Sequence, residues 1–73
     1  MYRVISPTKI VAQRGGKTRR AVIERIDKRL TEQELFAYEK GIYRPSEKKL
    51  GLLLQALDCS FEDISEPKEL IAA

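Results

Sequence analysis

The amino-acid sequence predicts a compact all-α domain of five short helices. Apolar residues recur at three- and four-residue spacing along much of the chain, which is the signature of amphipathic helices. A serine or threonine precedes each of these stretches, and glycine or proline follows several of them. A chain of 73 residues, of which 42% are apolar, is long enough for one hydrophobic core and too short for two.

The first helix is expected to begin after Ser6, whose hydroxyl can cap a helix that has Pro7 at its first position. It should end at Gly15-Gly16, where a left-handed backbone carries little cost. Residues 1–5 before it are expected to form an extended N-terminal arm, so that the folded domain itself would span residues 6–66.

A second helix is expected to be capped by Thr18. Its apolar stripe would comprise Ala21, Val22, Ile23, Ile26 and Leu30. Because no glycine or proline lies between Thr18 and Tyr38, the break before the next helix must come from capping and tertiary packing.

The third helix is predicted over residues 31–40. Thr31-Glu32-Gln33-Glu34 fits a capping box, in which the Thr31 hydroxyl and the Glu34 carboxylate each satisfy a backbone amide. Leu35 and Tyr38 share one face and should pack inward, and Gly41 should end the helix.

Pro45-Ser46 predicts the start of a fourth helix, with an apolar stripe formed by Leu50, Leu53, Leu54 and Leu57. Leu52 lies off this stripe and is either a surface leucine or part of an interface. Ser60 should start a short fifth helix, with Phe61 and Ile64 facing inward, and Pro67 should end it. Residues 67–73 are then expected to be a flexible C-terminal tail.

The composition excludes several classes of function. The chain has one cysteine and no histidine, so it offers no intramolecular disulfide, no ordinary zinc site and no histidine-based catalysis. Neither a nucleophile–base pair nor a phosphate-binding glycine loop is present, and we expect no enzyme activity and no cofactor. Apolar runs are too short for a membrane span or a secretory signal, which predicts a cytoplasmic protein.

Charge is distributed unevenly along the chain. Residues 1–44 carry 11 Lys or Arg and 5 Asp or Glu, whereas residues 45–73 carry 3 and 6. A basic part joined to a mildly acidic part suggests that one face of the molecule meets a polyanion.

With these elements in place, the chain resembles the phage-repressor and Cro family of helix-turn-helix domains over roughly residues 6–64, which implies the lambda-repressor-like fold. Leu30-Thr31, Leu35 and Tyr38-Glu39-Lys40-Gly41 are similar to the recognition helix of that family and its ending. The segments that follow, Pro45 to Leu57 and Ser60 to Ile64, are similar to its fourth and fifth helices.

The sequence departs from the family pattern at three places. Asp27-Lys28-Arg29 replaces the usual glycine in the turn, and the connection is two residues longer. Arg19 stands where the family has glutamine, and Lys17 stands where an apolar residue usually precedes the cap of the second helix. The last two changes add cations and favour contact with phosphate.

The resemblance implies which residues would contact DNA. The recognition helix would lie in the major groove and contact base edges. These base contacts would come from Thr31, Glu32, Gln33 and Ala37. Phosphate contacts would come from the cations around it, Arg14, Lys17, Arg19, Arg20, Lys28, Arg29, Lys40 and Arg44.

Four other polar or reactive side chains are better explained by structure than by DNA contact. Glu34 serves the capping box, and Tyr38 packs in the core. Glu39 should tie the helix end to a nearby backbone group or arginine, and Cys59 should be a buried thiol.

The sequence therefore predicts a sequence-specific DNA-binding transcriptional regulator, most simply a repressor of phage, plasmid or bacterial type, associated with the nucleoid. It should bind double-stranded DNA as a homodimer on a pseudo-palindromic site, with Leu52, Phe61 or the N-terminal arm as candidate dimer contacts. Two alternatives remain: an antitoxin or adaptor that acts through protein–protein contacts, and an architectural or recombination accessory factor that binds mainly phosphates.

Overall fold

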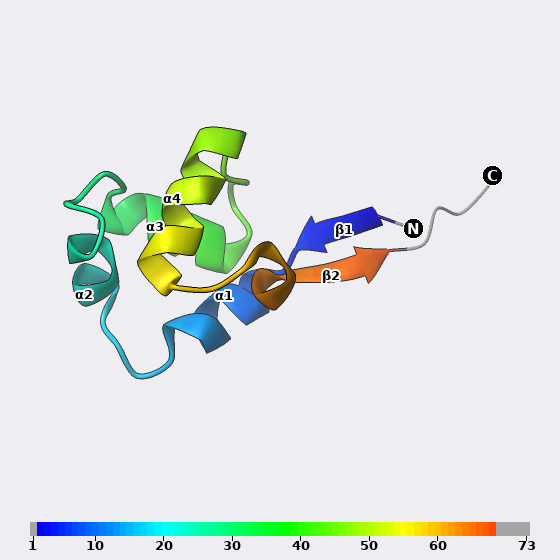
Figure 1. Ribbon diagram of the computed structural model, residues 1–73, viewed down its shortest axis with the longest axis horizontal. Coiled ribbons are helices and arrows are strands. Elements are labelled where there is room, and N and C mark those ends of the chain that lie inside the picture. The colour runs from blue at the N-terminus through cyan, green and yellow to red at the C-terminus, as the bar shows by residue number, and fades with distance from the viewer. Residues whose placement is uncertain (1, 69–73) are drawn as a thin grey trace.

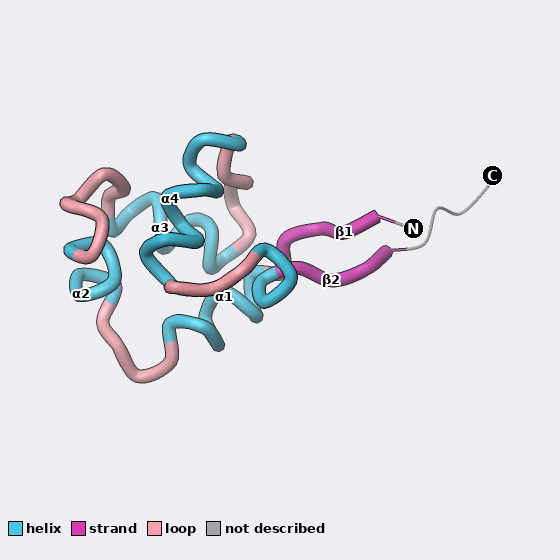
Figure 2. The backbone as a smooth tube through the Cα atoms, viewed as in Figure 1, coloured by secondary structure: helices cyan, strands magenta, loops and turns pink. Residues whose placement is uncertain are grey.

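The computed structural model describes residues 2–68, which form a helical body and a two-stranded antiparallel sheet that projects from one side of it (Figure 1; Figure 2). In chain order the elements are β1 (Tyr2–Ile5), α1 (Pro7–Arg14), α2 (Arg19–Glu24), α3 (Glu32–Lys40), α4 (Glu47–Leu57), a 3₁₀ turn η1 (Phe61–Ile64) and β2 (Ser65–Lys68). The predicted helical domain is therefore confirmed in outline, but the prediction of five helices and a purely α-helical fold is wrong. No helix within residues 2–68 has both the length and the apolar content needed to cross a bilayer.

Capping residues set where the four α-helices begin. Ser6, Thr18, Thr31 and Ser46 all have extended backbones, and the side chain of each accepts a hydrogen bond from the amide three residues later. The capping box is complete, since the Thr31 amide donates to Glu34 Oε1 at 3.1 Å and the Glu34 amide donates to Thr31 Oγ1 at 3.0 Å. Four of the five predicted helix starts are thus confirmed at their capping residues.

The second helix is shorter than its apolar stripe. α2 ends at Glu24, and the chain then turns through Asp27 and Lys28, whose φ angles are +54° and +59°. The Lys28 amide donates to the Ile23 carbonyl at 3.1 Å, which closes the turn against the end of the helix. Ile26 and Leu30 remain buried, so the longer connection is folded into the body instead of forming a loop in solvent.

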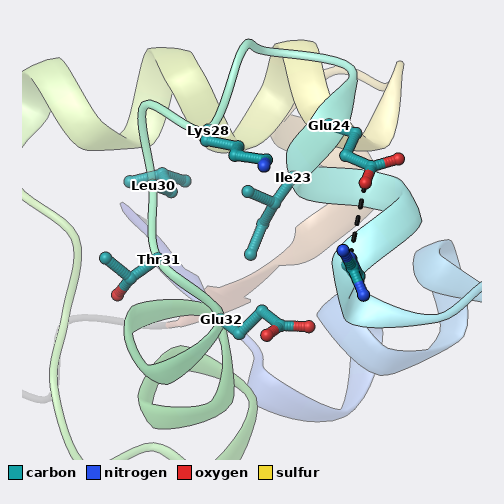
Figure 3. A pocket seen from close by; sticks show the side chains of 7 residues that line it. Ile23, Glu24, Lys28, Leu30, Thr31 and Glu32 are labelled. Carbon is teal, nitrogen blue, oxygen red and sulfur yellow. Dashed lines mark ion pairs between the residues drawn. The ribbon is translucent and has the colours of Figure 1, made fainter.

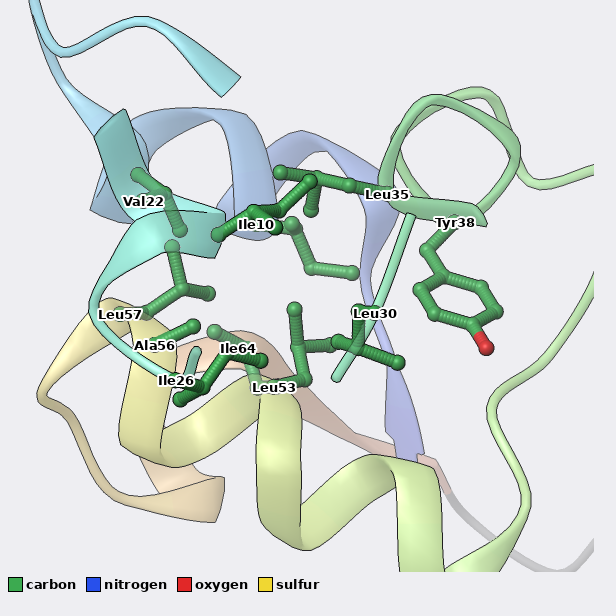
Figure 4. Packing of buried hydrophobic residues seen from close by; sticks show 11 residues of the cluster. Ile10, Val22, Ile26, Leu30, Leu35, Tyr38, Leu53, Ala56, Leu57 and Ile64 are labelled. Atoms are coloured by element: carbon green, nitrogen blue, oxygen red, sulfur yellow. The ribbon is translucent and has the colours of Figure 1, made fainter. Parts of the chain in front are cut away.

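One hydrophobic cluster joins α1, α2, α3, α4 and η1 (Figure 4). Its buried members are Ile10, Val22, Ile23, Ile26, Leu30, Leu35, Tyr38, Leu53, Ala56, Leu57 and Ile64. Leu50, Leu52 and Leu54 are partly buried and pack against this cluster, whereas Ala21, expected on the stripe of the second helix, is exposed. Since α3 contributes Leu35 and Tyr38, its inward face is fixed to the body and its other face is free.

The two ends of the described chain form an antiparallel pair of strands. β1 and β2 pair in register from Tyr2 with Lys68 to Ile5 with Ser65. The Arg3 guanidinium strengthens the pair, because its Nε donates to Ser65 Oγ at 2.8 Å and its Nη2 donates to the Ser65 carbonyl at 3.0 Å. The predicted arm is extended but paired, and the predicted tail is a strand at Pro67 and Lys68; residues 69–73 of that tail lie outside the described part of the chain.

The same pairing explains why the fifth helix is reduced to a single 3₁₀ turn. The Ser6 amide donates to the Ile64 carbonyl at 2.8 Å, so this carbonyl bonds across the fold rather than to a following helical amide. Ser65 then takes an extended backbone with φ −127° and leads into β2.

Gly41 has a backbone that other residues rarely adopt, with φ +73° at the end of α3, and a Cβ there would lie 3.3 Å from Pro7 Cγ. We expect Gly41→Ala to destabilise the fold by about 1–2 kcal/mol, from left-handed strain and this contact. Gly16→Ala is the matched control, since its φ lies outside the left-handed region and a Cβ meets nothing within 4 Å. It should stabilise by about 0.4–1 kcal/mol. Urea denaturation checks both, and equal midpoints for the two variants would contradict the expectation.

Candidate nucleic-acid interface

α3 presents a polar, exposed face on the side opposite to its core contacts. Leu35 and Tyr38 hold the helix to the body with 1% and 5% exposure, while Thr31, Glu32 and Gln33 are exposed along its first turn. Ala37, the fourth predicted base contact, is only 8% exposed, so little of its side chain lies on this face. The exposed side chain in this part of the helix is instead that of Phe36.

A hollow of about 350 Å³ separates the first turn of α3 from α2 (Figure 3). It is lined by Arg20, Ile23, Glu24, Lys28, Leu30, Thr31 and Glu32. Arg20 Nε lies 3.5 Å from Glu24 Oε1 on the α2 side, and both side chains are exposed. This hollow places two of the predicted phosphate-binding cations, Arg20 and Lys28, beside two of the predicted base-contacting residues.

A second hollow, of about 470 Å³, lies on the other side of Glu32 and is lined by Thr18, Arg19, Glu32, Gln33 and Phe36. The Phe36 side chain is 42% exposed. Arg19 Cζ lies 5.0 Å from the centre of its ring, and Lys40 Nζ lies 5.6 Å from it. Both distances are within the range of cation–π attraction, so the two cations hold the ring in place at the surface.

Glu39 anchors the end of α3 through two arginines. Its side chain is 1% exposed, and its carboxylate accepts from Arg14 Nε at 2.9 Å and from Arg14 Nη2 at 3.1 Å. Arg19 Nη2 lies 3.1 Å from Glu39 Oε1. The predicted structural role of Glu39 is confirmed.

This anchor changes the role of the two arginines. Arg14 also donates from Nη1 to the Lys17 carbonyl at 2.8 Å, and its side chain is 18% exposed. Arg14 is therefore bound inside the fold and is not placed as a phosphate ligand. The Arg19 side chain keeps 34% exposure and can still reach an anion while it contacts Glu39 and Phe36.

The remaining predicted cations do not all lie on one side. Lys28 lines the hollow beside the start of α3, whereas its neighbour Arg29 lines a different hollow with Arg25 and Gln55 of α4. Arg29 therefore does not border the hollow beside the start of α3. Lys17 is exposed in the connection before α2, Lys40 is exposed at the last position of α3, and Arg44 is exposed beyond it.

Glu34 and Tyr38 belong to the support of this face. Glu34 forms an ion pair with Lys49 of α4 and accepts from Thr31, and the hydrogen bond from Lys49 is the main cause that lowers the pKa of its carboxyl group. Burial raises the pKa of the Tyr38 hydroxyl, and burial likewise raises the pKa of the Cys59 thiol. The predictions of a capping role for Glu34 and a packing role for Tyr38 are confirmed.

Phe36 is the residue of this face that sequence reasoning missed. Leu35 and Tyr38 define the inward edge of the helix, and Phe36 is rotated by about 100° from Leu35. A large aromatic side chain outside the apolar edge of a short amphipathic helix was the available signal.

Comparison with known proteins agrees with this geometry. A family model described as helix-turn-helix matches residues 9–64, which include all four α-helices and η1 apart from the first residues of α1. No curated protein and no solved structure matches the chain significantly.

Proposed function

The chain belongs to the phage-repressor and Cro type of helix-turn-helix family, whose members bind DNA, and from this premise we propose that it is a sequence-specific repressor. One observation carries the proposal: the outer face of α3 is exposed and polar, while its inner face is fixed by Leu35, Tyr38 and the buried Glu39 carboxylate. A rigid helix that projects polar side chains is the arrangement that reads base edges in the major groove.

In this proposal the first turn of α3 enters the major groove. Gln33 pairs with adenine through two hydrogen bonds, and Glu32 accepts from the exocyclic amine of cytosine. Thr31 can contact a base or a phosphate with the oxygen that also caps the helix.

Phosphate contacts come from cations that surround α3. Arg20 and Lys28 border the hollow beside the first turn of α3, and Arg19 borders the hollow that Gln33 lines. Lys17 lies in the connection before α2, and Lys40 and Arg44 lie at and beyond the end of α3. These contacts would set affinity and register, since phosphates carry no base sequence.

We further propose that the protein binds as a homodimer to a pseudo-palindromic site. A single domain of this size offers a small DNA interface, and pairing two copies on two half-sites raises the affinity. Leu52 is partly buried on α4, and Phe61 is partly buried on η1, so each leaves apolar surface for a second copy. Sedimentation of the protein with and without a palindromic duplex measures the stoichiometry.

Selection of bound duplexes from a random DNA pool, followed by titration over a salt series, tests the proposal. A regulator should select a short consensus and bind it more tightly than random DNA at every salt concentration. An affinity that falls as the salt concentration rises, with no preference among DNA sequences, would support an architectural factor. No binding at low salt would contradict DNA binding altogether and favour a protein partner.

We expect Gln33→Ala to relax base preference at one position of each half-site. The variant should lose about tenfold of its discrimination there, because one bidentate pair contributes about 1–3 kcal/mol. The salt slope should stay unchanged, since no phosphate contact is removed. Repeating the selection with the variant measures this, and an unaltered consensus would remove Gln33 from the interface.

Arg20→Ala should weaken binding to all sequences alike and flatten the salt slope by about 0.9 for each phosphate that the variant no longer neutralises. Arg25→Ala is the matched control, because both arginines pair with exposed carboxylates, Arg20 with Glu24 at 3.5 Å and Arg25 with Asp58 at 3.6 Å. Arg25 borders the hollow toward α4 and should leave the slope unchanged. Equal slopes for the two variants would contradict the proposed docking.

A further inference from the structure

Phe36 is an exposed aromatic ring held in a fixed position on the outer face of α3. It is the largest exposed apolar side chain of that helix, while the other exposed large apolar residues among the described ones lie in other segments. The ring lies under the Arg19 guanidinium at 5.0 Å and the Lys40 ammonium at 5.6 Å. Arg19 is itself fixed by Glu39, so the ring is supported by a group anchored in the core.

The chemistry around the ring indicates what it contacts. Phe36 forms one hollow with Gln33, Glu32, Arg19 and Thr18, so an apolar surface lies between groups that can bind base edges and groups that can bind phosphate. In the major groove, the apolar group that a base presents is the C5-methyl of thymine, and phenylalanine is one of the side chains that contacts it. The same methyl group is present on 5-methylcytosine.

We propose that Phe36 is a specificity-determining residue that packs against the C5-methyl group of a pyrimidine, thymine in unmodified DNA. The inference rests on the proposed function, because it requires α3 to lie in the major groove. In this docking Arg19 and Lys40, whose charged groups lie over the ring, bind the flanking phosphates.

Helix geometry fixes where the methyl group should lie. Gln33 and Phe36 are three residues apart, which corresponds to about 4.5 Å along the helix axis. Successive base pairs are about 3.4 Å apart. The pyrimidine read by Phe36 should therefore lie within two base pairs of the position at which Gln33→Ala relaxes the preference.

The test uses the duplex selected by the wild-type protein, with each thymine replaced in turn by deoxyuridine, which lacks only the methyl group. Wild-type affinity should fall by about fourfold at one position of a half-site, because the burial of one methyl group is lost. Phe36→Ala and Phe36→Gln should bind more weakly and show no penalty at that position. Val11→Ala, which alters an apolar residue of similar exposure (40%) on α1, should keep the full penalty.

A second arm separates the methyl group from the rest of the base. At the sensitive position, a cytosine duplex should bind the wild type more tightly when the cytosine carries a C5-methyl group, and both Phe36 variants should ignore the methylation. Absence of any deoxyuridine effect, or an equal penalty in the wild type and both Phe36 variants, would overturn the role of Phe36 while leaving sequence-specific binding intact. Loss of all sequence preference in the wild-type selection would instead overturn the proposed function and this inference together.

Discussion

Glu39→Ala is expected to destabilise the fold by about 3 kcal/mol, because it leaves the Arg14 guanidinium partly buried without its partner. The change removes one carboxylate that binds two arginines and is itself 1% exposed. A domain of 73 residues has a small total stability, so this loss should remove a large part of it. Urea denaturation measures the effect: the midpoint should fall, while the dependence of the unfolding free energy on urea concentration should stay unchanged.

Glu24→Ala provides the matched control for Glu39→Ala. Glu24 also pairs with an arginine, Arg20, but both side chains are more than half exposed. Its removal should cost about 0–1 kcal/mol, since an exposed pair gains little over hydrated charges. A double-mutant cycle with Arg14→Ala should show strong coupling to Glu39. Equal losses for Glu24→Ala and Glu39→Ala would mean that the buried carboxylate is not an anchor of α3.

Leu35→Ala should be the other large loss, about 2–5 kcal/mol, because it opens a cavity beneath α3 where the wild-type side chain is 1% exposed. The corresponding fall in melting temperature is roughly 8–40 °C for a domain of this size. Leu52→Ala removes the same atoms from a partly buried site on α4 and should cost much less. Thermal melts of both variants measure the difference, and similar melting temperatures would show that α3 is not held by its core face.

The Leu35 variant also separates folding from DNA reading. Leu35 contacts no base in the proposed docking, so any weakening of binding at low temperature, where the variant is still folded, would come from misplacement of α3. A lower affinity without a change of the consensus sequence would show that the inward face of α3 determines the position of the helix and that its outer face determines which bases are recognised.

The helix starts could be predicted because capping is a local interaction. Ser6, Thr18, Thr31 and Ser46 each bond to an amide only three residues away, so the residues that determine a start are all visible in one short window. The inward positions of Leu35 and Tyr38 followed from helical periodicity in the same way.

The β1–β2 pair could not be predicted from either of its strands. Each strand has four residues, neither has a clear alternation of polar and apolar side chains, and Pro67 indicates the end of an element rather than a strand. What holds the strands is contact between distant segments, such as the bond from Arg3 to Ser65, 62 residues along the chain. Propensity within a window carries no information on such a pairing.

The site was predictable at the level of the helix and less so at the level of side chains. The first turn of α3 is exposed, as the sequence predicts. One turn further on, however, the predicted contact residue Ala37 is buried and its neighbour Phe36 is exposed. The sequence shows that Arg14 is a cation, which suggests phosphate binding. It does not show which residue the arginine pairs with in the fold. That partner is Glu39, 25 residues away.

The β1–β2 pair also constrains the order in which the chain can fold. Its strands meet only after a loop of about sixty residues has closed, which carries a large entropic cost when the intervening chain is unstructured. Assembly of the helical body brings Ile5 and Ser65 together and removes most of that cost, so the strand pair should form after the helices and open before them. The contacts that position α3 would then persist when the β1–β2 pair opens, and the exposed face of α3 would be independent of that opening.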